Sequence, residues 1–285
     1  MQRIAELEDS PRGLYTGALG WLAPGGDCRF SVAIRTVEVD PGRCARLGVG
    51  SGIVADADPD REYAECLLKA RFLTGFDPGF ELLETLRLEA GRYPLLSLHL
   101  ERLQASAHSL GFACPLPALS SALAAEALAR PAGVFRVRLT LAHDGGHQIA
   151  ASPLVEDKGT HWQVVLAAEA LSATDYLLRH KTTARARYDR ALAALAARPT
   201  VFDAIFVNTR GEVCEGARSN VFIERDGILL TPPPSCGLLP GVMRRQLLAS
   251  GRAIERVLRL DDLRLASALY VGNAVRGLIP VSLEL

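Results

Sequence analysis

Lys181 is the residue in this sequence whose surroundings point most strongly to chemistry. It stands in His180-Lys181-Thr182-Thr183. A lysine amine whose pKa is lowered in a protected site can attack an aldehyde and can also carry a proton. A single lysine is usually a solvated surface residue, so the motifs that follow carry more weight. They come in the order Asp203 to Asn208, Gly211 to Gly216, Ser219 to Phe222, Leu230 to Pro233 and Gly237 to Arg244.

This ordered series of motifs resembles the class IV aminotransferases. The family includes branched-chain and D-amino-acid aminotransferases and aminodeoxychorismate lyase, and the resemblance extends from about residue 80 to the C-terminus. It implies pyridoxal 5'-phosphate as the cofactor, a small-molecule substrate and a homodimer. It also implies an α+β fold of two lobes, a small α/β lobe and a larger β-barrel-like lobe.

The resemblance assigns roles to three residues around the reactive end of the cofactor. Lys181 occupies the position of the lysine that forms the Schiff base. Glu215, in Glu215-Gly216-Ala217-Arg218-Ser219-Asn220, matches the carboxylate that keeps the ring nitrogen protonated, which the ring needs in order to accept electrons. Tyr188 is farther from the lysine than the tyrosine of branched-chain members. It either contacts a cofactor oxygen or packs against a helix.

A second group of residues is assigned to the phosphate end of the cofactor. Pro240-Gly241-Val242-Met243 opens a helix whose free backbone amides suit a phosphate. The resemblance gives the amides of Val242 and Met243 this task, together with the side chains of Arg102 and Asn273. It places Leu238 against the cofactor ring.

Composition and charge limit the class of partner. The chain has 285 residues, 49% of them hydrophobic, and its 32 Lys and Arg balance 32 Asp and Glu. No overall field therefore favours nucleic acid or an anionic membrane. The six cysteines are scattered and predict reduced thiols rather than disulfides or a zinc site. No apolar run approaches the ~20 residues of a membrane span, which makes the cytoplasm the default location.

The residue pattern predicts three segments along the chain. Residues 1–75 combine glycine-rich strands, near 13–17, 30–37 and 47–54, with a helix over 62–72. Residues 76–175 form the small lobe and residues 176–285 the large cofactor-binding lobe. In the small lobe we expect a hairpin of 80–88 with 92–96, in which Glu84 and Thr85 begin the strand that lines the substrate side in the family. A helix over 99–110 should stop at Gly111.

The remaining elements follow from the same periodicities. Strands and helices are expected in the order of a hairpin over 134–153, a strand over 162–167, a helix over 188–197, strands over 202–208 and 221–230, a helix over 241–250 and a helix-strand stretch over 261–281.

The first 75 residues carry a second resemblance, to the C-terminal end of chorismate-binding enzymes, specifically component I of aminodeoxychorismate synthase. It rests on the motifs Pro11 to Gly17, Phe30 to Thr36, Gly50 to Val54 and Glu62 to Ala70. Glu62 and Glu65, one helical turn apart, match carboxylates that hold Mg²⁺. The rest of that fold is missing from this sequence, so we expect no functional metal site, no synthase activity and exposed sheet edges.

Three functions are consistent with these motifs. The leading hypothesis is aminodeoxychorismate lyase, which converts 4-amino-4-deoxychorismate to 4-aminobenzoate and pyruvate, because a chorismate-amination segment precedes the class IV segment. The alternatives are an aminotransferase for D-amino or branched-chain amino acids and an inactive fragment of a bifunctional synthase and lyase. In a full-length fusion, a glutamine amidotransferase subunit is a further partner.

Overall fold

The computed structural model describes residues 6–8, 11–40, 45–74, 77–155 and 161–284. The chain divides into two compact units, residues 1–78 and 79–285. None of the helices described is both long and apolar enough to cross a membrane. Five cysteines lie in the described part of the chain without a disulfide partner there, and two of them, Cys214 and Cys236, are buried.

The N-terminal unit consists of two separate hairpins and one helix. The hairpins are β1 (Ala18–Leu22) with β2 (Cys28–Val32), and β3 (Val37–Val39) with β4 (Ala45–Leu47), and the helix is α2 (Pro59–Thr74). Helix α2 confirms the prediction of a helix over 62–72. The predictions of strands over 13–17 and 47–54 are wrong, because residues 13–16 form turns and only Leu47 of the second segment lies in a strand. Glycine weakens isolated strands that lack partners on both sides.

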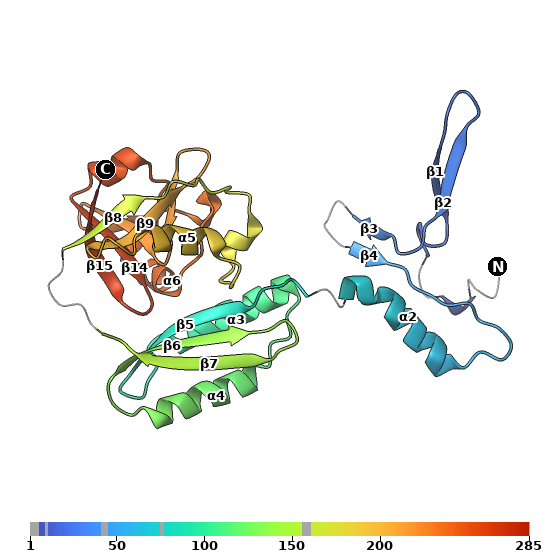
Figure 1. Ribbon diagram of the computed structural model, residues 1–285, viewed down its shortest axis with the longest axis horizontal. Helices are drawn as coiled ribbons and strands as arrows, with labels where there is room; N and C mark the ends of the chain where they lie inside the picture. Colours follow the sequence, from blue (N-terminus) through green and yellow to red (C-terminus); the bar gives the residue numbers. More distant parts are fainter. Residues whose placement is uncertain (1–5, 9–10, 41–44, 75–76, 156–160, 285) are drawn as a thin grey trace. The chain divides into compact units, whose positions relative to one another are not determined.

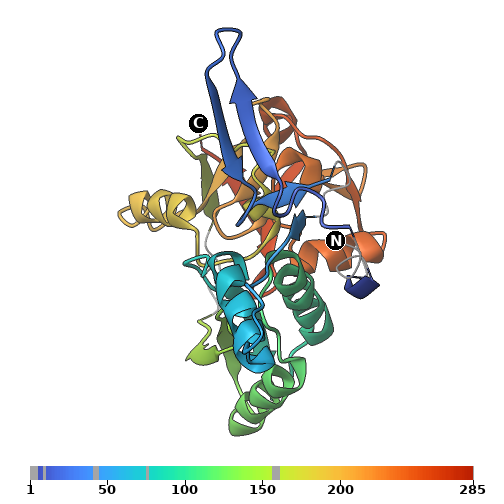
Figure 2. The same cartoon turned by 90° about the vertical axis from the view of Figure 1, so that its right-hand side faces the viewer.

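This unit buries very little apolar surface. Among its described residues, Ala33 is the only buried apolar side chain. Large apolar side chains on both hairpins and on the helix are exposed, including those of Trp21, Phe30, Leu68 and Phe72. The β1–β2 ribbon has two unpaired edges, and it stands out as the dark blue hairpin in both views (Figures 1 and 2). The sequence expectation of exposed sheet edges therefore agrees with this unit.

The smaller lobe of the second unit is a three-stranded antiparallel sheet with two helices on one face. Its strands lie in the order β5 (Leu82–Glu89), β6 (Val134–Leu141), β7 (His147–Pro153), and its helices are α3 (Leu96–Leu110) and α4 (Leu116–Ala129). The helices, green in Figure 2, meet the sheet in one core. That core contains Leu82, Leu86, Leu88, Leu103, Ala107, Leu119, Leu123, Val137, Leu139 and Leu141.

Two features of this lobe differ from the sequence prediction. Strand β5 pairs with β6 over its whole length, from Leu82 opposite Leu141 to Glu89 opposite Val134. The expected hairpin with 92–96 is therefore wrong, and only an isolated bridge joins Glu89 to Arg92 before α3 begins. The pairing with β6 is favoured because it places three leucines of β5 against the core side chains of β6.

Helix α4 was not predicted from the sequence, because its apolar residues form no single stripe. The predicted C-terminus of α3 at Gly111, with φ of 75°, is confirmed.

The larger lobe is built on a closed six-stranded barrel. Around it run β10 (Val213–Gly216), β9 (Val201–Val207), β8 (Trp162–Leu166), β15 (Gly277–Leu283), β14 (Ala268–Asn273) and β11 (Asn220–Arg225), and β12 (Ile228–Thr231) and β13 (Ala253–Glu255) extend the sheet beyond β11. One residue pair, Glu215 opposite Asn220, joins β10 to β11 and closes the ring. Strand β8 lies upstream of the lobe boundary expected at 175, yet it pairs in parallel with both β9 and β15.

Short helices surround the barrel (Figure 1). They are the single-turn helix η1 (Tyr176–Arg179), α5 (Ala186–Ala194), the single-turn helix η2 (Pro234–Cys236), α6 (Val242–Ala249) and α7 (Leu260–Arg264). The α+β class and the two-lobed architecture, with a barrel in the larger lobe, are confirmed.

We expect proteases to cut the N-terminal unit first. Few of its described residues are buried, so its local unfolding should cost less free energy than that of the barrel lobe. Brief digestion with a protease of broad specificity, followed by intact-mass measurement, should leave a core that begins near residue 79. Early cleavage inside the barrel, with residues 11–74 intact, would contradict this order of stability.

Candidate active site

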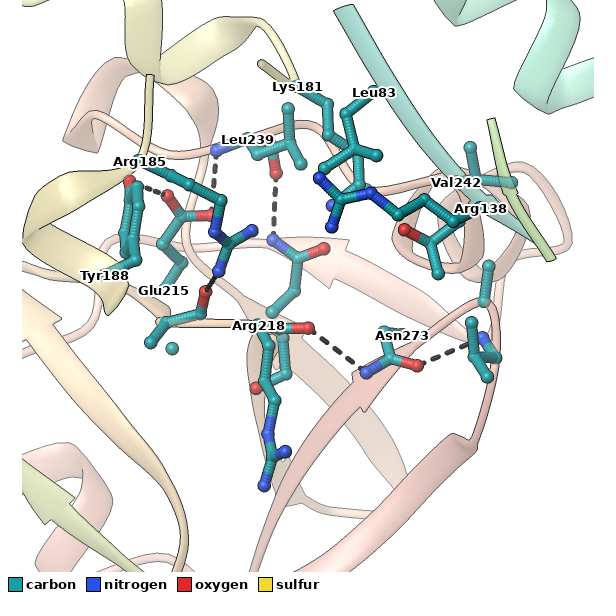
Figure 3. Close-up of a pocket in the computed structure, with 18 of the residues that line it drawn as sticks. Leu83, Arg138, Lys181, Arg185, Tyr188, Glu215, Arg218, Leu239, Val242 and Asn273 are labelled. Atoms are coloured by element: carbon teal, nitrogen blue, oxygen red, sulfur yellow. Dashed lines mark hydrogen bonds between the residues drawn. The ribbon is translucent and has the colours of Figure 1, made fainter. Parts of the chain in front are cut away.

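A cavity of about 620 Å³ opens between the two lobes of the second unit. The smaller lobe contributes residues of β5 and β6 that face away from its helices, among them Thr85 and Arg138. The larger lobe contributes the end of β10, the start of α6 and the end of β14. Lys181 and Glu215 project into this space from different segments (Figure 3). The cavity is large enough for a cofactor together with a small substrate.

The backbone of Lys181 is held by the smaller lobe. Residues 181–183 run beside the start of β5, where the Leu83 amide donates to the Lys181 carbonyl at 2.9 Å and the Thr183 amide donates to the Glu81 carbonyl at 2.8 Å. Leu82 and Thr182 form an antiparallel bridge between these bonds. The lysine that the sequence assigned to the large lobe is thus attached to the sheet of the small one.

Burial, together with the positive charges of Arg102 and Arg185, lowers the pKa of the Lys181 ammonium to about 8. Glu84 and Glu215 oppose the shift but do not cancel it. The neutral amine, which is the nucleophilic form, is therefore far more populated near neutral pH than in an ordinary lysine. Lys181 consequently has the property that the sequence motif requires.

Glu215 is a buried carboxylate whose two oxygens are both hydrogen-bonded. The Tyr188 hydroxyl donates to Oε1 at 2.6 Å, and the Leu239 amide donates to Oε2 at 3.0 Å. Burial raises the pKa of Glu215 to about 7, although these two bonds and the charge of Lys181 favour the ionised form. Each oxygen keeps a free lone pair, so the carboxylate can also accept a hydrogen bond from a protonated ring nitrogen.

The structure gives the Tyr188 hydroxyl a partner within the protein. Its hydroxyl is directed to Glu215, and its ring packs edge-on against Phe206 with ring centroids 5.2 Å apart. The tyrosine thus fixes the carboxylate in addition to packing on its neighbours. Its spacing from Lys181 could not predict this arrangement, because the two partners lie 27 residues apart in the sequence.

The start of α6 forms the opposite end of the cavity. Val242 lines the cavity, and no side chain caps the helix at Gly241, so amides of the first turn are available to an anion. A Cβ at Gly241 would lie 2.0 Å from Asn220 Oδ1, which explains the glycine there. The Met243 side chain is buried with Phe222 beneath the helix, so only its amide is suited to the predicted task.

Arg102, Asn273 and Leu238 differ in how well their positions match the sequence prediction. Arg102 lines the cavity and forms an ion pair with Glu84. Asn273 also lines it, but its Oδ1 accepts the amides of Val275 and Arg276 at 3.0 Å and its Nδ2 donates to the Arg218 carbonyl. Its side chain therefore holds the turn after β14.

Leu238 is a correction, because the structure does not bring its side chain to the cavity. It is fully buried in the core cluster that contains Leu171 and Phe206. The next residue, Leu239, lines the cavity in its place and also donates its amide to Glu215. Neighbouring residues in an extended segment point to opposite sides, so a displacement of one residue exchanges core and cavity.

The sequence missed two cavity residues that had a recognisable signal. Arg136 and Arg138 alternate on β6 with Val137 and Leu139, which belong to the core. Such alternation puts the two arginines together on the other face of the sheet, and Figure 3 shows Arg138 extending into the cavity. Neither guanidinium has a hydrogen-bond or ion-pair partner within the described residues.

The magnesium candidates of the sequence lie in the other unit. Glu62 and Glu65 are on α2, and Glu65 pairs with Lys69 at 2.7 Å. Within the described residues, no group of three or more His, Cys, Asp or Glu side chains is arranged to hold a metal ion.

The cavity residues together fit an aldehyde-bearing heterocycle with a phosphate arm. Lys181 offers a nucleophilic amine, Glu215 an anion for the ring nitrogen, and α6 a helix N-terminus for the phosphate. These are the three recognition elements that pyridoxal 5'-phosphate needs.

Comparison with known proteins agrees with both resemblances. The family model of class IV amino-transferases matches residues 81–283, and that of chorismate binding enzymes matches residues 1–75. A candidate amino-acid aminotransferase from Mesorhizobium loti has a solved structure that is 41% identical, with a TM-score of 0.68, over 72% of this chain and 100% of its own.

Two further structures share the fold at lower identity. The 4-amino-4-deoxychorismate lyase of Pseudomonas aeruginosa is 21% identical, with a TM-score of 0.62, over 82% of this chain and 88% of its own. A hypothetical aminotransferase from Mycobacterium tuberculosis, solved in its PLP-bound form, is 24% identical, with a TM-score of 0.64, over 87% of this chain and 91% of its own.

The curated relatives match only the N-terminal unit. Anthranilate synthase component 1 of Lactococcus lactis is 46% identical over 72 residues, and aminodeoxychorismate synthase of Streptomyces pristinaespiralis is 49% identical over 71 residues. Each match covers 25% of this chain, which spans 16% and 10% of the two relatives.

We expect the pH dependence of cofactor capture to report the lowered pKa of Lys181. The rate at which the apoprotein binds pyridoxal 5'-phosphate covalently should rise with pH, reach half its maximum near pH 8 and level off about one pH unit higher, because the amine is half neutral at its pKa. Stopped-flow absorbance measures the rate, and borohydride trapping with peptide mapping locates the attachment. A rate that keeps rising to about 10.4, the ordinary lysine value, would contradict the burial of Lys181, and Lys181→Ala should abolish trapping.

Glu215→Gln should stabilise the apoprotein at alkaline pH while impairing function. A protein whose carboxyl has a pKa raised by folding loses stability as the pH rises from about 4.5, the ordinary pKa of that group, to about 7, its pKa in the folded chain. The loss amounts to about 3 kcal/mol for Glu215. The glutamine removes this loss, so the melting temperature should rise at pH 8 but little at pH 4, as differential scanning calorimetry can show. An equal change in melting temperature at both pH values would indicate that ionising Glu215 does not destabilise the folded protein.

Proposed function

The chain belongs to the class IV aminotransferase family, whose cofactor is pyridoxal 5'-phosphate, and on this premise we propose that it is an aminodeoxychorismate lyase. The reaction would convert 4-amino-4-deoxychorismate to 4-aminobenzoate and pyruvate. When bound, the cofactor supplies an aldehyde that condenses with amines and a protonated ring that accepts an electron pair. The chain's own residues supply attachment, orientation and proton transfer.

Lys181 has two tasks in the proposed reaction. Its amine would hold the cofactor and, when free, would remove the proton from the amine-bearing carbon of the substrate. The lowered pKa allows the same group to accept that proton and then to donate it to the leaving enolpyruvate. Glu215 keeps the ring nitrogen protonated by its negative charge, and Tyr188 and Leu239 keep Glu215 in place.

One observation carries the choice of the lyase over other reactions of the family. The class IV unit follows, in the same chain, a segment that is 49% identical over 71 residues to an aminodeoxychorismate synthase. The product of such a synthase is the substrate of the lyase, and this pairing supports a role in p-aminobenzoate synthesis. A homodimer, and a glutamine amidotransferase partner for any form that contains a whole synthase domain, are part of the proposal.

The charge of the cavity also supports an anionic substrate. Arg136 and Arg138 line it without protein partners within the described residues, on the side formed by β6. The proposed substrate carries two carboxylates, one on the ring and one on the enolpyruvyl arm, which guanidinium groups bind well. A branched-chain amino acid has one carboxylate and an apolar side chain, and it would leave these charges unmatched.

Transamination is the second candidate, favoured by the 41% identity to a candidate amino-acid aminotransferase. Lys181, Glu215 and the start of α6 would serve that chemistry equally well. The two reactions differ in what occupies the β6 side of the cavity and in whether an amino group or pyruvate is released.

The decisive assay supplies the cofactor-loaded chain with 4-amino-4-deoxychorismate. We expect 4-aminobenzoate and pyruvate in equal amounts, and none with Lys181→Ala. A parallel assay with D-alanine or a branched-chain amino acid plus 2-oxoglutarate should give little glutamate. Cofactor-loaded protein that forms glutamate but no 4-aminobenzoate would reject the lyase in favour of the aminotransferase.

Arg138→Gln should weaken the binding of the substrate without weakening the binding of the cofactor. Loss of one guanidinium that pairs with a carboxylate should raise KM by about 10-fold or more, with cofactor affinity nearly unchanged. Arg264→Gln is the matched control, because Arg264 is on α7, outside the cavity, and pairs with Asp261. Equal effects of the two substitutions, or none of Arg138→Gln, would remove Arg138 from the substrate site.

A further inference from the structure

Glu84 is a buried charge for which the reaction provides no direct task. It is 2% exposed and lies on the side of β5 that faces the helices, between Leu82 and Leu86 of the core. A buried carboxylate is strongly unfavourable unless charged or polar partners compensate its lost hydration. The partners of Glu84 therefore indicate what it is for.

All its partners come from one face of α3. Arg102 donates from Nε to Oε1 at 2.8 Å and from Nη2 to Oε2 at 2.6 Å, and His99 Nδ1 lies 2.6 Å from Oε2. The paired contact with Arg102 is bidentate, which fixes the plane of the guanidinium as well as its position. His99 and Arg102 both line the cavity, whereas Glu84 itself does not.

The bidentate pair leaves part of the guanidinium free. Nη1 has no carboxylate partner and donates one hydrogen bond, at 3.5 Å, to the carbonyl of Pro240, two residues before the start of α6. Arg102 thus presents its remaining donors beside the backbone amides of Val242. An anion at the helix N-terminus would meet both sets of donors.

Glu84 also lies next to the residue that holds the lysine. Leu83 donates its amide to the Lys181 carbonyl, and Glu84, one position later on β5, binds Arg102. Two consecutive residues of one strand therefore set the separation between the amine and the arginine.

The charge state of Glu84 suits a permanent anchor. Burial would raise its pKa, but Arg102 and His99 outweigh burial and hold the pKa at about 2. The carboxylate therefore stays ionised at every pH at which the enzyme could work.

We propose that Glu84 is a positioning residue of the cofactor site, fixing the Arg102 guanidinium beside the start of α6 so that the cofactor phosphate is held in register with Lys181. The inference rests on the proposed cofactor site but is independent of which reaction follows. It also explains why the charge is buried: a second acceptor of Arg102 within the cavity would compete with the phosphate, whereas Glu84 binds the far edge of the guanidinium.

The test compares two aldehydes that differ only in the phosphate. Apoprotein is titrated with pyridoxal 5'-phosphate and with pyridoxal, and binding is followed by the absorbance of the Lys181 adduct without any substrate. Glu84→Gln should raise Kd for pyridoxal 5'-phosphate by about 10-fold or more and that for pyridoxal by less than about twofold. Glu84→Gln with Arg102→Gln should bind no more weakly than Arg102→Gln alone, because both changes remove the same contact.

Glu89→Gln is the matched control. Glu89 is on the same strand and pairs with an arginine, Arg87, but it is half exposed and does not line the cavity. Its Kd for both aldehydes should remain that of the unchanged chain. The melting curve of each apoprotein shows whether the fold is retained. Glu84→Asp, which keeps the charge but shortens the reach, should recover part of the phosphate preference.

Several results would overturn the proposal. Equal weakening of both aldehydes by Glu84→Gln would mean that Glu84 acts on Lys181 or on the fold, and unchanged binding would mean that Arg102 needs no anchor. If neither Glu84→Gln nor Glu84→Asp retains a cooperative melting transition, its role is structural. If the unchanged chain binds neither aldehyde, the proposal of a cofactor site is itself rejected. Normal binding of pyridoxal 5'-phosphate without formation of 4-aminobenzoate would reject only the proposed lyase activity.

Discussion

The short antiparallel pairing between residues 181–183 and the start of β5 is the constraint on which the site depends. Two backbone hydrogen bonds and one bridge attach the lysine segment to the smaller lobe, although the rest of the cavity floor belongs to the barrel. Glu215, Leu239 and α6 are positioned by the larger lobe. The amine therefore meets its electrostatic partners only when the two lobes are docked, and the cavity exists only in that state.

Burial in this cavity changes two groups in opposite directions, and both changes favour the same chemistry. It lowers the pKa of Lys181 to about 8 and raises that of Glu215 to about 7. Both shifts reduce the charge that is buried in the cavity. A cationic ring placed between the two groups would restore the negative charge on Glu215 while leaving the amine free to react. The site is thus electrostatically completed by the cofactor.

The sequence predicted the long elements and the reactive residues better than it predicted orientation. Helices α2 and α3 and strands β8, β9 and β11 were predicted from the periodicity of their apolar residues. Lys181 and Glu215 were identified because separated motifs occur in a fixed order. Leu238 was misplaced by one residue, since a loop carries no periodic signal for the direction of a side chain. The partner of β5 was misassigned because pairing depends on residues about 50 positions later, and the Glu84–Arg102 contact is set by that tertiary arrangement.

The closure of the barrel has a consequence for how the protein responds to ligands. The ring is completed by one residue pair, Glu215 opposite Asn220, and both residues line the cavity. The seam of the fold and the wall of the binding site therefore share these two residues. A ligand that engages Glu215 would reinforce the weakest junction of the barrel, so that occupancy is converted directly into resistance to unfolding.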